Sequence, residues 1–337
     1  MRPLTMSVTL PLLMVVLLSL LSSKISRAQE SRTSSFIPSA QSVDDQPGKY
    51  MIIEGDILVP VDFYEKNRLA ATWETKFWPD GIVPYEFDAN VTAQNRTKML
   101  AAMAEWKKVA NVNFRLRSGE SDYIHIQSAN NNSSSVGRQG GQQFINITSW
   151  NSKFVIAHEL GHALGYWHEQ SRPDRDNFVQ INWNNIQNGQ QSAFGKRNDA
   201  GVYGPYDFDS VMHYDQCAFS IDCPPGSTCN CTNPTITVLP PNQAWQSLIG
   251  QSNHLSQMDT LTMSFLYPED NWRFVDKSYT GLFQFGTFLY PFKEFTAGAI
   301  AVPTGGTLWI QPGTYSAVRV YDKRMTVKAP LGGVVLK

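Results

Sequence analysis

The sequence predicts an α+β fold, with a twisted sheet and helices in a main domain and a small β-rich module after it. Between residues 78 and 165, short apolar runs of strand length alternate with two segments that have helical patterns. From residue 269 onward, short apolar runs are separated by glycine and proline. The chain has 337 residues, 42% of them hydrophobic, which is enough for packed cores in two or three domains.

The charge balance argues against some classes of partner. The chain has 28 Lys and Arg residues against 29 Asp and Glu residues, a net charge of -1. This balance provides no electrostatic attraction to nucleic acid or to an anionic membrane surface. We therefore expect no nucleic-acid partner.

Residues 1–28 are typical of a secretory signal peptide. Arg2 precedes an apolar run of twelve residues, Leu10–Leu21, and the small residues Ser26 and Ala28 suit a cleavage site. The alternative is an uncleaved membrane anchor, but the run is shorter than the ~20 residues that a spanning helix needs. We expect cleavage near Ala28 and a secreted, extracellular protein with no stable membrane anchor. Residues 29–48 follow as a polar, flexible leader.

The main domain is expected to begin with a strand and a helix. The turn signal Trp78-Pro79-Asp80-Gly81 precedes a short strand at Ile82–Phe87, whose Pro84 suits an edge position. From Thr92 to Val109, apolar residues recur at helical spacing among Lys and Glu residues. An amphipathic helix that covers the sheet is expected there.

Two further strands are expected at Val112–Leu116 and Tyr123–Gln127. In the second, His125 alternates with Ile124 and Ile126, which suits the polar face of an edge strand. The next segment, residues 130–141, is polar and rich in glycine and predicts a loop.

The remaining elements include one clear helix. Residues 154–165 predict an apolar helix that ends at Gly165. Regular structure should then be sparse up to residue 268. In residues 269–337 a helical pattern is found only near 292–302. We place the main domain at 69–268 and the β-rich module at 269–337.

All four cysteines lie within fifteen residues, at Cys217, Cys223, Cys229 and Cys231. In a secreted chain, an even and clustered set suggests two local disulfides that staple a surface loop, with three possible pairings. A four-cysteine zinc site is the alternative, but the spacing lacks a pair of CxxC motifs. We favour the disulfides.

The stretch HELGHALGYWH, which ends at His168, carries the chemistry. In a helix, His158 and His162 lie one turn apart on the same face, so both can reach one zinc ion while Glu159 points toward a zinc-bound water. Gly165 can adopt the positive φ that turns the chain back and brings His168 to the metal as the third ligand. A chance match to the five fixed positions of HExxHxxGxxH is expected about once in several million start points. The alternative, that these are ordinary core or surface histidines, is correspondingly weak.

A second motif follows downstream, because Ser210-Val211-Met212-His213-Tyr214 supplies the Met-turn that the extended zinc motif requires. Residues 78–268 resemble the astacin family of metzincin zinc endopeptidases. The resemblance lies in this Met-turn together with the stretches HELGHALGYWHEQSRPDRD, WPDGIVPYEF and VGRQGGQQ. The resemblance implies a metzincin-type zinc peptidase domain with an active-site helix. It also implies a hydrolase that cleaves protein or peptide substrates, with one catalytic Zn²⁺ as cofactor.

The resemblance also implies a role for each site residue. Glu159 would be the general base and then the general acid, and Met212 would form a hydrophobic floor below the metal. Tyr214 would be a switchable zinc ligand that swings away to stabilise the oxyanion, although an ordinary buried tyrosine remains the alternative. Glu169 would be buried and bind the mature amino terminus. The zinc ligands would be His158, His162 and His168.

Two further features concern the substrate cleft. The strand at Tyr123–Gln127 resembles the family's substrate-pairing edge, which would bind a peptide by β-augmentation. The cysteine loop follows Tyr214 directly, so it could shape the cleft or only staple the surface, and we favour the surface.

Residues 29–68 resemble the family's propeptide. Ile53-Glu54-Gly55-Asp56 is similar to its FxGD motif with Ile in place of Phe, and the carboxylate of Asp56 can occupy the open position on zinc. The chain would then be a zymogen that needs an activating protease to cut close to Arg68. The alternative is that Glu54-Gly55-Asp56 is simply a turn.

Residues 274–337 resemble the opening coil of right-handed parallel β-helix proteins, through phrases such as GTLWIQPGTYS. Two or three coils are fewer than a free-standing solenoid stacks, so an accessory module is expected. A hypothesis from another class is a binding protein whose module engages glycans or a cell surface beside a vestigial peptidase domain. Intact Glu159 and Tyr214 argue against it.

Overall fold

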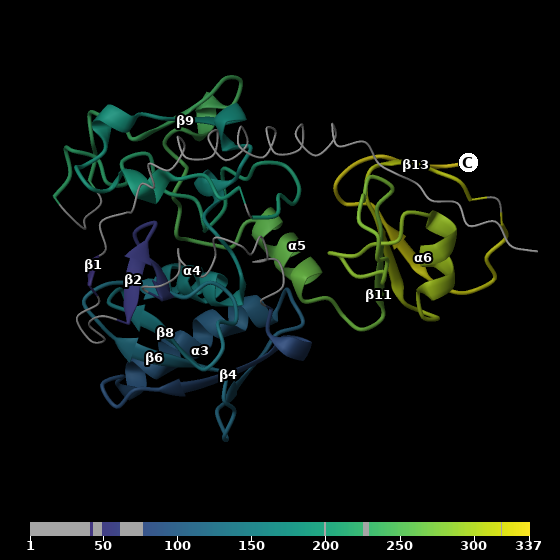
Figure 1. Cartoon of the computed structure of the whole chain (residues 1–337), viewed down its shortest axis with the longest axis horizontal. Helices are drawn as coiled ribbons and strands as arrows, with labels where there is room; N and C mark the ends of the chain where they lie inside the picture. The colour runs from purple at the N-terminus through teal and green to yellow at the C-terminus, as the bar shows by residue number, and fades with distance from the viewer. Residues whose placement is uncertain (1–40, 43–48, 61–76, 199, 225–228, 318) are drawn as a thin grey trace, which may run out of the picture. The chain divides into compact units, whose positions relative to one another are not determined.

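The computed structural model describes residues 41–42, 49–60, 77–198, 200–224, 229–317 and 319–337 (Figure 1). The expected signal peptide, the expected activation cut and the tip of the cysteine loop lie outside these residues. Within the described part of the chain, no helix is both long and apolar enough to cross a bilayer.

An eight-stranded mixed sheet forms among the described residues before position 148. Its strands are β1 (Gln41–Ser42), β2 (Tyr50–Ile53), β3 (Ile57–Pro60), β4 (Ile82–Phe87), β5 (Asn113–Leu116), β6 (Tyr123–Ser128), β7 (Ser133–Ser134) and β8 (Gln142–Ile147). The order across the sheet is β1-β2-β3-β7-β8-β6-β4-β5. Strands β5, β4, β6 and β8 are parallel, and β7 is antiparallel to β8. The predicted strands at 82–87, 112–116 and 123–127 are therefore confirmed to within one residue.

The edge position predicted for Pro84 is wrong, because β4 is an interior strand. It pairs with β5 on one side and with β6 on the other. The ladder with β6 begins only at Tyr85, so Pro84 lies one residue before it. At that place the missing N–H of proline removes no hydrogen bond to β6.

Strand β6 is also interior, so the prediction of a substrate-pairing edge at Tyr123–Gln127 is wrong. It is bonded to β4 and to β8. His125 is half-buried between two carboxylates, with Nδ1 2.9 Å from Glu86 Oε1 and Nε2 3.2 Å from Asp88 Oδ2. Alternation of polar and apolar residues fits both an edge and an interior strand, and the neighbours in the sheet decide between them.

Beyond β8 the sheet continues with β7 and with strands from the segment that precedes the main domain. Strand β7 lies inside the predicted loop 130–141 and is fully buried. Strand β3 pairs with β7 at Ile57 and Ser134, and Asp56 O accepts a hydrogen bond from Ser134 N at 2.8 Å. The segment at residues 50–60 thus adds strands to the sheet.

Two helices, α3 (Ala93–Lys107) and α4 (Lys153–Leu164), pack on this sheet and against each other (Figure 1). Both predicted helices are confirmed. Trp106 of α3 is fully buried, and its Nε1 donates to Ala157 O of α4 at 2.9 Å. Leu100, part of the predicted apolar pattern, is 47% exposed instead.

Regular structure after α4 is sparse, as predicted, except for one unexpected helix. Strand β9 (Val179–Ile181) pairs antiparallel with β10 (Ile236–Val238). The unexpected helix is α5 (Gln257–Leu266), which begins with a reciprocal capping box between Ser256 and Asp259. The short 3₁₀ helices are η3 (Pro79–Gly81), η4 (Glu169–Ser171), η5 (Arg175–Asn177), η6 (Trp183–Asn185), η7 (Gln191–Phe194) and η8 (Gln243–Trp245).

The cysteines form two local disulfides, Cys217–Cys231 and Cys223–Cys229. The prediction of two disulfides is therefore confirmed and one of the three pairings is selected. The four-cysteine zinc site is excluded, because no cysteine is free.

The C-terminal segment forms a small β-rich unit in which every strand pairing among the described residues is parallel. Its elements are β11 (Trp272–Val275), α6 (Phe295–Ala301), β12 (Thr307–Ile310), β13 (Gly313–Tyr315), β14 (Thr326–Lys328) and β15 (Val334–Leu336). Helix α6 lies within the predicted region 292–302. Phe265 of α5 packs against Phe274 and Trp309, with ring centroids 5.2 and 5.0 Å away. An aromatic cluster therefore joins this unit to the main domain.

Candidate zinc centre

The three motif histidines converge on one point. His158 and His162 come from the same face of α4, and their Nε2 atoms are 3.0 Å apart. His168 comes from the segment that follows the helix, and its ring centroid lies 5.3 Å from that of His158 and 4.7 Å from that of His162. The turn that returns the chain is therefore as important to this site as the helix.

Gly165 makes that turn. It ends α4 with φ 120°, and its N–H donates to His162 O at 2.8 Å. A Cβ at this position would lie 3.0 Å from Phe77 Cε1. Both the backbone angle and the close neighbour favour glycine.

We expect Gly165→Ala to lower the free energy of unfolding by about 1–3 kcal/mol, because alanine is strained at this φ and meets Phe77. Zinc affinity should fall as well, since the turn places His168. Urea unfolding and zinc titration would measure both effects. Gly333→Ala is the control, because its Cβ would meet no atom within 4 Å. Equal stability and equal zinc affinity for the two variants would contradict this role.

Backbone carbonyls fix the orientation of the two helical imidazoles. His158 Nδ1 lies 2.8 Å from Val211 O, and His162 Nδ1 lies 2.7 Å from Tyr166 O. A carbonyl only accepts, so each Nδ1 carries the hydrogen and each Nε2 presents a lone pair. Burial also lowers the pKa of His162 to about 4, which keeps its imidazole neutral.

Asp56 completes the cluster. Its Oδ2 lies 3.2 Å from His158 Nε2, and its Oδ1 lies 3.2 Å from His168 Nε2 and 3.7 Å from His162 Nε2. Burial raises the pKa of the Asp56 carboxyl, but the facing imidazoles lower it more, to well below its usual range. Asp56 is thus a carboxylate at neutral pH.

The donor set fits one metal ion. The ligand atoms of the four residues all lie within 4.8 Å of one another. Asp56 Oδ1 and His168 Nε2 are buried and have no hydrogen-bond partner among the described residues, although they are 3.2 Å apart. One cation bound between these two buried atoms would satisfy both of them. Three imidazoles and one carboxylate are ligands that tetrahedral Zn²⁺ accepts.

Glu159 lies beside this cluster and outside it. Its side chain is buried, and Oε2 has no hydrogen-bond partner within the described part of the chain. Burial, and secondly the charge of Asp56, raises the pKa of Glu159 well above its usual value. A buried carboxyl with an open oxygen is suited to proton transfer.

The Met-turn packs against α4, the helix that carries His158 and His162. Met212 is buried, and a Cβ on Gly161 would lie 3.0 Å from its Sδ. Tyr214 packs on His168 with ring centroids 4.6 Å apart, and its hydroxyl donates to Glu54 O. Burial, followed by the nearby carboxylates, raises the pKa of Tyr214 well above its usual value, so the phenol stays a donor.

Comparison with known proteins agrees with this geometry. Residues 70–268 match the family model described as Astacin, a peptidase family. The chain belongs to the astacin family. High choriolytic enzyme 2 of Oryzias latipes is 31% identical over 224 residues, which cover 64% of this chain and 75% of the fish protein. Zinc metalloproteinase nas-14 of Caenorhabditis elegans is 39% identical over 224 residues, 64% of this chain and 42% of the worm protein.

A solved structure extends the similarity to the fold. High choriolytic enzyme 1 from Oryzias latipes, a hatching enzyme zinc-protease, matches with a TM-score of 0.51 and 34% identity, over 58% of this chain and 95% of that one. The astacin chain described here is therefore a zinc metalloendopeptidase with an α+β peptidase domain.

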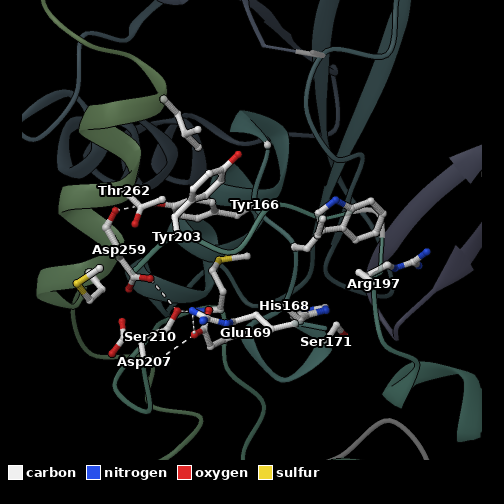
Figure 2. Close-up of a pocket in the computed structure, with 18 of the residues that line it drawn as sticks. Tyr166, His168, Glu169, Ser171, Arg197, Tyr203, Asp207, Ser210, Asp259 and Thr262 are labelled. Carbon is white, nitrogen blue, oxygen red and sulfur yellow. Dashed lines mark hydrogen bonds and ion pairs between the residues drawn. The ribbon is translucent and has the colours of Figure 1, made fainter. Parts of the chain in front are cut away.

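A cavity of about 120 Å³ adjoins the zinc centre of this astacin domain (Figure 2). Glu169 lines it, held by Arg172 Nη1 at 3.0 Å and by Asp207 N at 2.8 Å. Burial raises the pKa of Glu169 to about 7 and that of Asp207 to about 6, and it also raises the pKa of Asp259. Three carboxyl groups thus share one small cavity with two guanidinium groups, that of Arg172 beside Glu169 and that of Arg197.

The cysteine loop reaches the site, so the preferred interpretation of a surface staple is incomplete. Phe219, between the two disulfide half-cystines at 217 and 223, packs on Tyr214 with ring centroids 5.8 Å apart. A Cβ on Gly55 would lie only 2.5 Å from Phe219 Cζ. The disulfides thereby hold an aromatic wall against the segment that carries Asp56.

Three residues beside the zinc centre, Glu54, Ser171 and Arg197, have contacts that the sequence did not predict. The carboxylate of Glu54 is 1% exposed and accepts from Ser171 Oγ at 3.0 Å, from Arg197 Nε, and from His168 Nδ1 at 3.1 Å. Although burial raises its pKa, the charge of Arg197 and the hydrogen bond from His168 lower the pKa of Glu54 below its usual value. These contacts join segments more than 100 residues apart, so spacing gives no signal for them. The only sequence clue is that Glu54 lies within the Glu-Gly-Asp motif.

Proposed function

We propose that this chain is the secreted zymogen of an astacin endopeptidase, kept latent by Asp56. The contact of the Asp56 carboxylate with all three motif imidazoles carries the proposal. A carboxylate there takes the position that a catalytic zinc site leaves open for water or substrate. The apolar run in residues 10–21 and the two local disulfides support secretion.

In the mature enzyme, the residues around the metal position would divide the chemistry among them. Bound zinc supplies a Lewis acid that polarises the scissile carbonyl and acidifies water. Glu159 takes a proton from the attacking water at its open oxygen and returns it to the nitrogen of the leaving amine. Tyr214, whose hydroxyl donates to Glu54 O in the zymogen, would donate to the oxyanion instead.

Activation would require a protease to cut close to residue 68 and release the segment before it. Departure of β3 would uncover β7, whose Ser134 N donates to Asp56 O in the zymogen. An extended peptide could then pair with that free edge by β-augmentation. The substrate edge is thus assigned to β7 in place of the strand at 123–127.

The new amino terminus would enter the cavity lined by Glu169. The lining has three carboxyl groups, Glu169, Asp207 and Asp259, against two guanidinium groups, Arg172 and Arg197, which leaves room in the charge balance for one ammonium group. Burial of these carboxyls costs less when a cation lies among them. Glu169 would therefore hold the mature domain in its active arrangement.

Hydrolysis of denatured casein tests the peptidase assignment of this chain. We expect protein cut near residue 68 to be active, and 1,10-phenanthroline to abolish that activity until zinc is restored. Uncut protein, with its intact mass verified, is the control and should be nearly inactive. Equal activity in both forms would contradict latency. No activity in a zinc-loaded, correctly cut protein would contradict the endopeptidase function.

A further inference from the structure

A second cavity, of about 340 Å³, lies where the β-rich C-terminal unit meets the main domain. Most of its walls come from the β-rich unit, and the rest come from Phe265 of α5 and from residues 202–204. None of the four donors of the zinc centre lines it. Cavities that hold small molecules in proteins have volumes of about 300–1,000 Å³. This cavity is therefore large enough for a ligand of its own.

Aromatic side chains form the buried part of the lining. Phe265, Phe274 and Trp309 are all buried and pack against one another. Phe288 adds a further ring, whose centroid lies 5.0 Å from that of Phe265 and 4.8 Å from that of Tyr203. Because these rings support each other, the cavity is already formed before a ligand enters. Such preorganisation lowers the cost of binding.

Polar groups form the partly exposed part of the lining. Asp276, Tyr279 and Gln311 are half-buried and belong to this part. Asp276 Oδ1 accepts from Ser278 N at 2.8 Å and from Ser278 Oγ at 2.6 Å, which leaves Oδ2 without a partner among the described residues. The Tyr279 hydroxyl and the Gln311 amide group also have no hydrogen-bond partner in the described part of the chain. These groups are therefore available to a ligand.

The indole of Trp309 adds a buried donor. Its side chain is 7% exposed, and Nε1 has no hydrogen-bond partner within the residues that the structure describes. A buried N–H without an acceptor lowers stability. An acceptor oxygen of a ligand held against this side chain would remove that cost. The lining thus combines apolar ring surface with several unused hydrogen-bonding groups.

The charges around the cavity disfavour ionic and purely apolar ligands. Among the described residues that line it there is no Lys, Arg or His, so an anion would lose its water without gaining a cation. A cation held against Trp309 would meet the ammonium group of Lys328, whose Nζ lies 4.9 Å from the centroid of that ring. A purely apolar ligand would cover the Asp276 carboxylate without replacing its water. The lining therefore favours a neutral ligand that has both hydroxyl groups and apolar faces.

We propose that this cavity binds a neutral pyranose sugar, as part of an uncharged glycan. The apolar C–H faces of the sugar ring lie on the aromatic side chains, and its hydroxyl groups donate to Asp276 and bond with Gln311 and Tyr279. This inference goes beyond the endopeptidase function and does not depend on it. A sugar bound here would hold the enzyme on a glycan while the zinc centre remains available to a protein substrate.

Titration of the whole, uncut chain with sugars tests the cavity. The neutral probes are the methyl glycosides of D-glucose, D-galactose, D-mannose and N-acetyl-D-glucosamine, and the charged probes are methyl glucuronide and choline. We expect a neutral probe to bind with a Kd of about 1 mM, as for a ligand of this size, when binding is measured by saturation-transfer NMR. Each charged probe should bind at least about tenfold more weakly, because burial of its charge is not compensated.

Two substitutions that remove polar groups of the lining should weaken sugar binding. Asp276→Asn should raise the Kd by about tenfold, because a hydrogen bond to a carboxylate is stronger than one to an amide oxygen. Tyr279→Phe should raise it by about threefold, as for one lost neutral hydrogen bond. The matched controls are Asp270→Asn and Tyr290→Phe, since both residues lie in the β-rich unit and neither lines the cavity. Both controls should keep the Kd of the unchanged chain.

Three outcomes would overturn the sugar site. The first is that no neutral probe binds at concentrations up to about 50 mM, far above the expected Kd. The second is binding that both Asp276→Asn and Tyr279→Phe leave unchanged. The third is binding of choline or methyl glucuronide as tight as that of the neutral probes, which would assign the cavity to a charged ligand. If Asp276→Asn does not fold, Tyr279→Phe still decides, because it removes a single hydroxyl group. No peptide is cleaved in this experiment, so its failure leaves the endopeptidase proposal unaffected.

Discussion

Glu159→Gln should lower kcat/KM of the mature enzyme by about a thousandfold while the protein keeps its zinc. The amide cannot take a proton from water or return one to the leaving amine, and general acid–base catalysis accounts for factors of this size. Zinc should stay bound because the donors that remain after activation are His158, His162 and His168, and Glu159 is outside this group. Peptide hydrolysis and zinc content by atomic absorption, measured on the same sample, would show both results.

The control for this experiment is Glu105→Gln, which changes a carboxylate on α3 that pairs with Lys108 and Lys153 at the surface. It should leave kcat/KM within about twofold of the unchanged enzyme, as for a surface ion pair. Retention of more than a tenth of the activity in Glu159→Gln would exclude Glu159 as the general base. Loss of zinc together with activity would indicate that Glu159 binds the metal.

Asp56→Ala should convert the uncut chain from an inactive protein into one that cleaves short peptides at least about a hundredfold faster than uncut protein of the original sequence. The Asp56 carboxylate contacts all three imidazoles, and its removal leaves an open position of the kind that a catalytic zinc site requires. The expected gain is smaller than that produced by the activating cut, because Glu54 still accepts from Arg197 and its carbonyl still engages Tyr214.

The measurement for Asp56→Ala is peptide hydrolysis by protein whose mass shows no cleavage. Asp270→Ala, an exposed carboxylate in the module, is the matched control and should stay inactive. An uncut Asp56→Ala protein that binds zinc and remains as inactive as the control would show that latency depends on something other than this carboxylate. Activation of the control to the same level would show that the gain does not depend on the Asp56 carboxylate.

Local patterns predicted most of the elements around the site. The helices at 93–107 and 153–164 follow from spacing of apolar residues, and Gly165 ends the second one because its φ of 120° suits glycine. The HExxHxxGxxH spacing placed His158, His162 and His168 together, since one helical turn and one glycine turn fix their separation. These are short-range constraints, and short-range constraints can be read from the order of residues.

Sheet neighbours could not be read in the same way. The sequence suggested an edge for Pro84 and for the strand with His125, whereas β4 and β6 are both interior. The sequence of a strand indicates which of its residues are buried, but it does not indicate which strands pair with it. The order of the sheet is set by packing of distant segments, including the pairing of β3 with β7.

The sequence by itself predicted the three histidines that converge as metal donors, the proposed general base beside them, a set of four cysteines that form two local disulfides, and the Glu-Gly-Asp segment as the candidate for latency. The tertiary structure alone decided which cysteines pair, that Phe219 packs on Gly55 and Tyr214, and that Glu54 reaches Ser171 and Arg197. The physical reason is distance along the chain. Residues within one or two turns are constrained by backbone geometry, whereas the Glu54 contacts span 117 and 143 residues and exist only because burial brings those segments together.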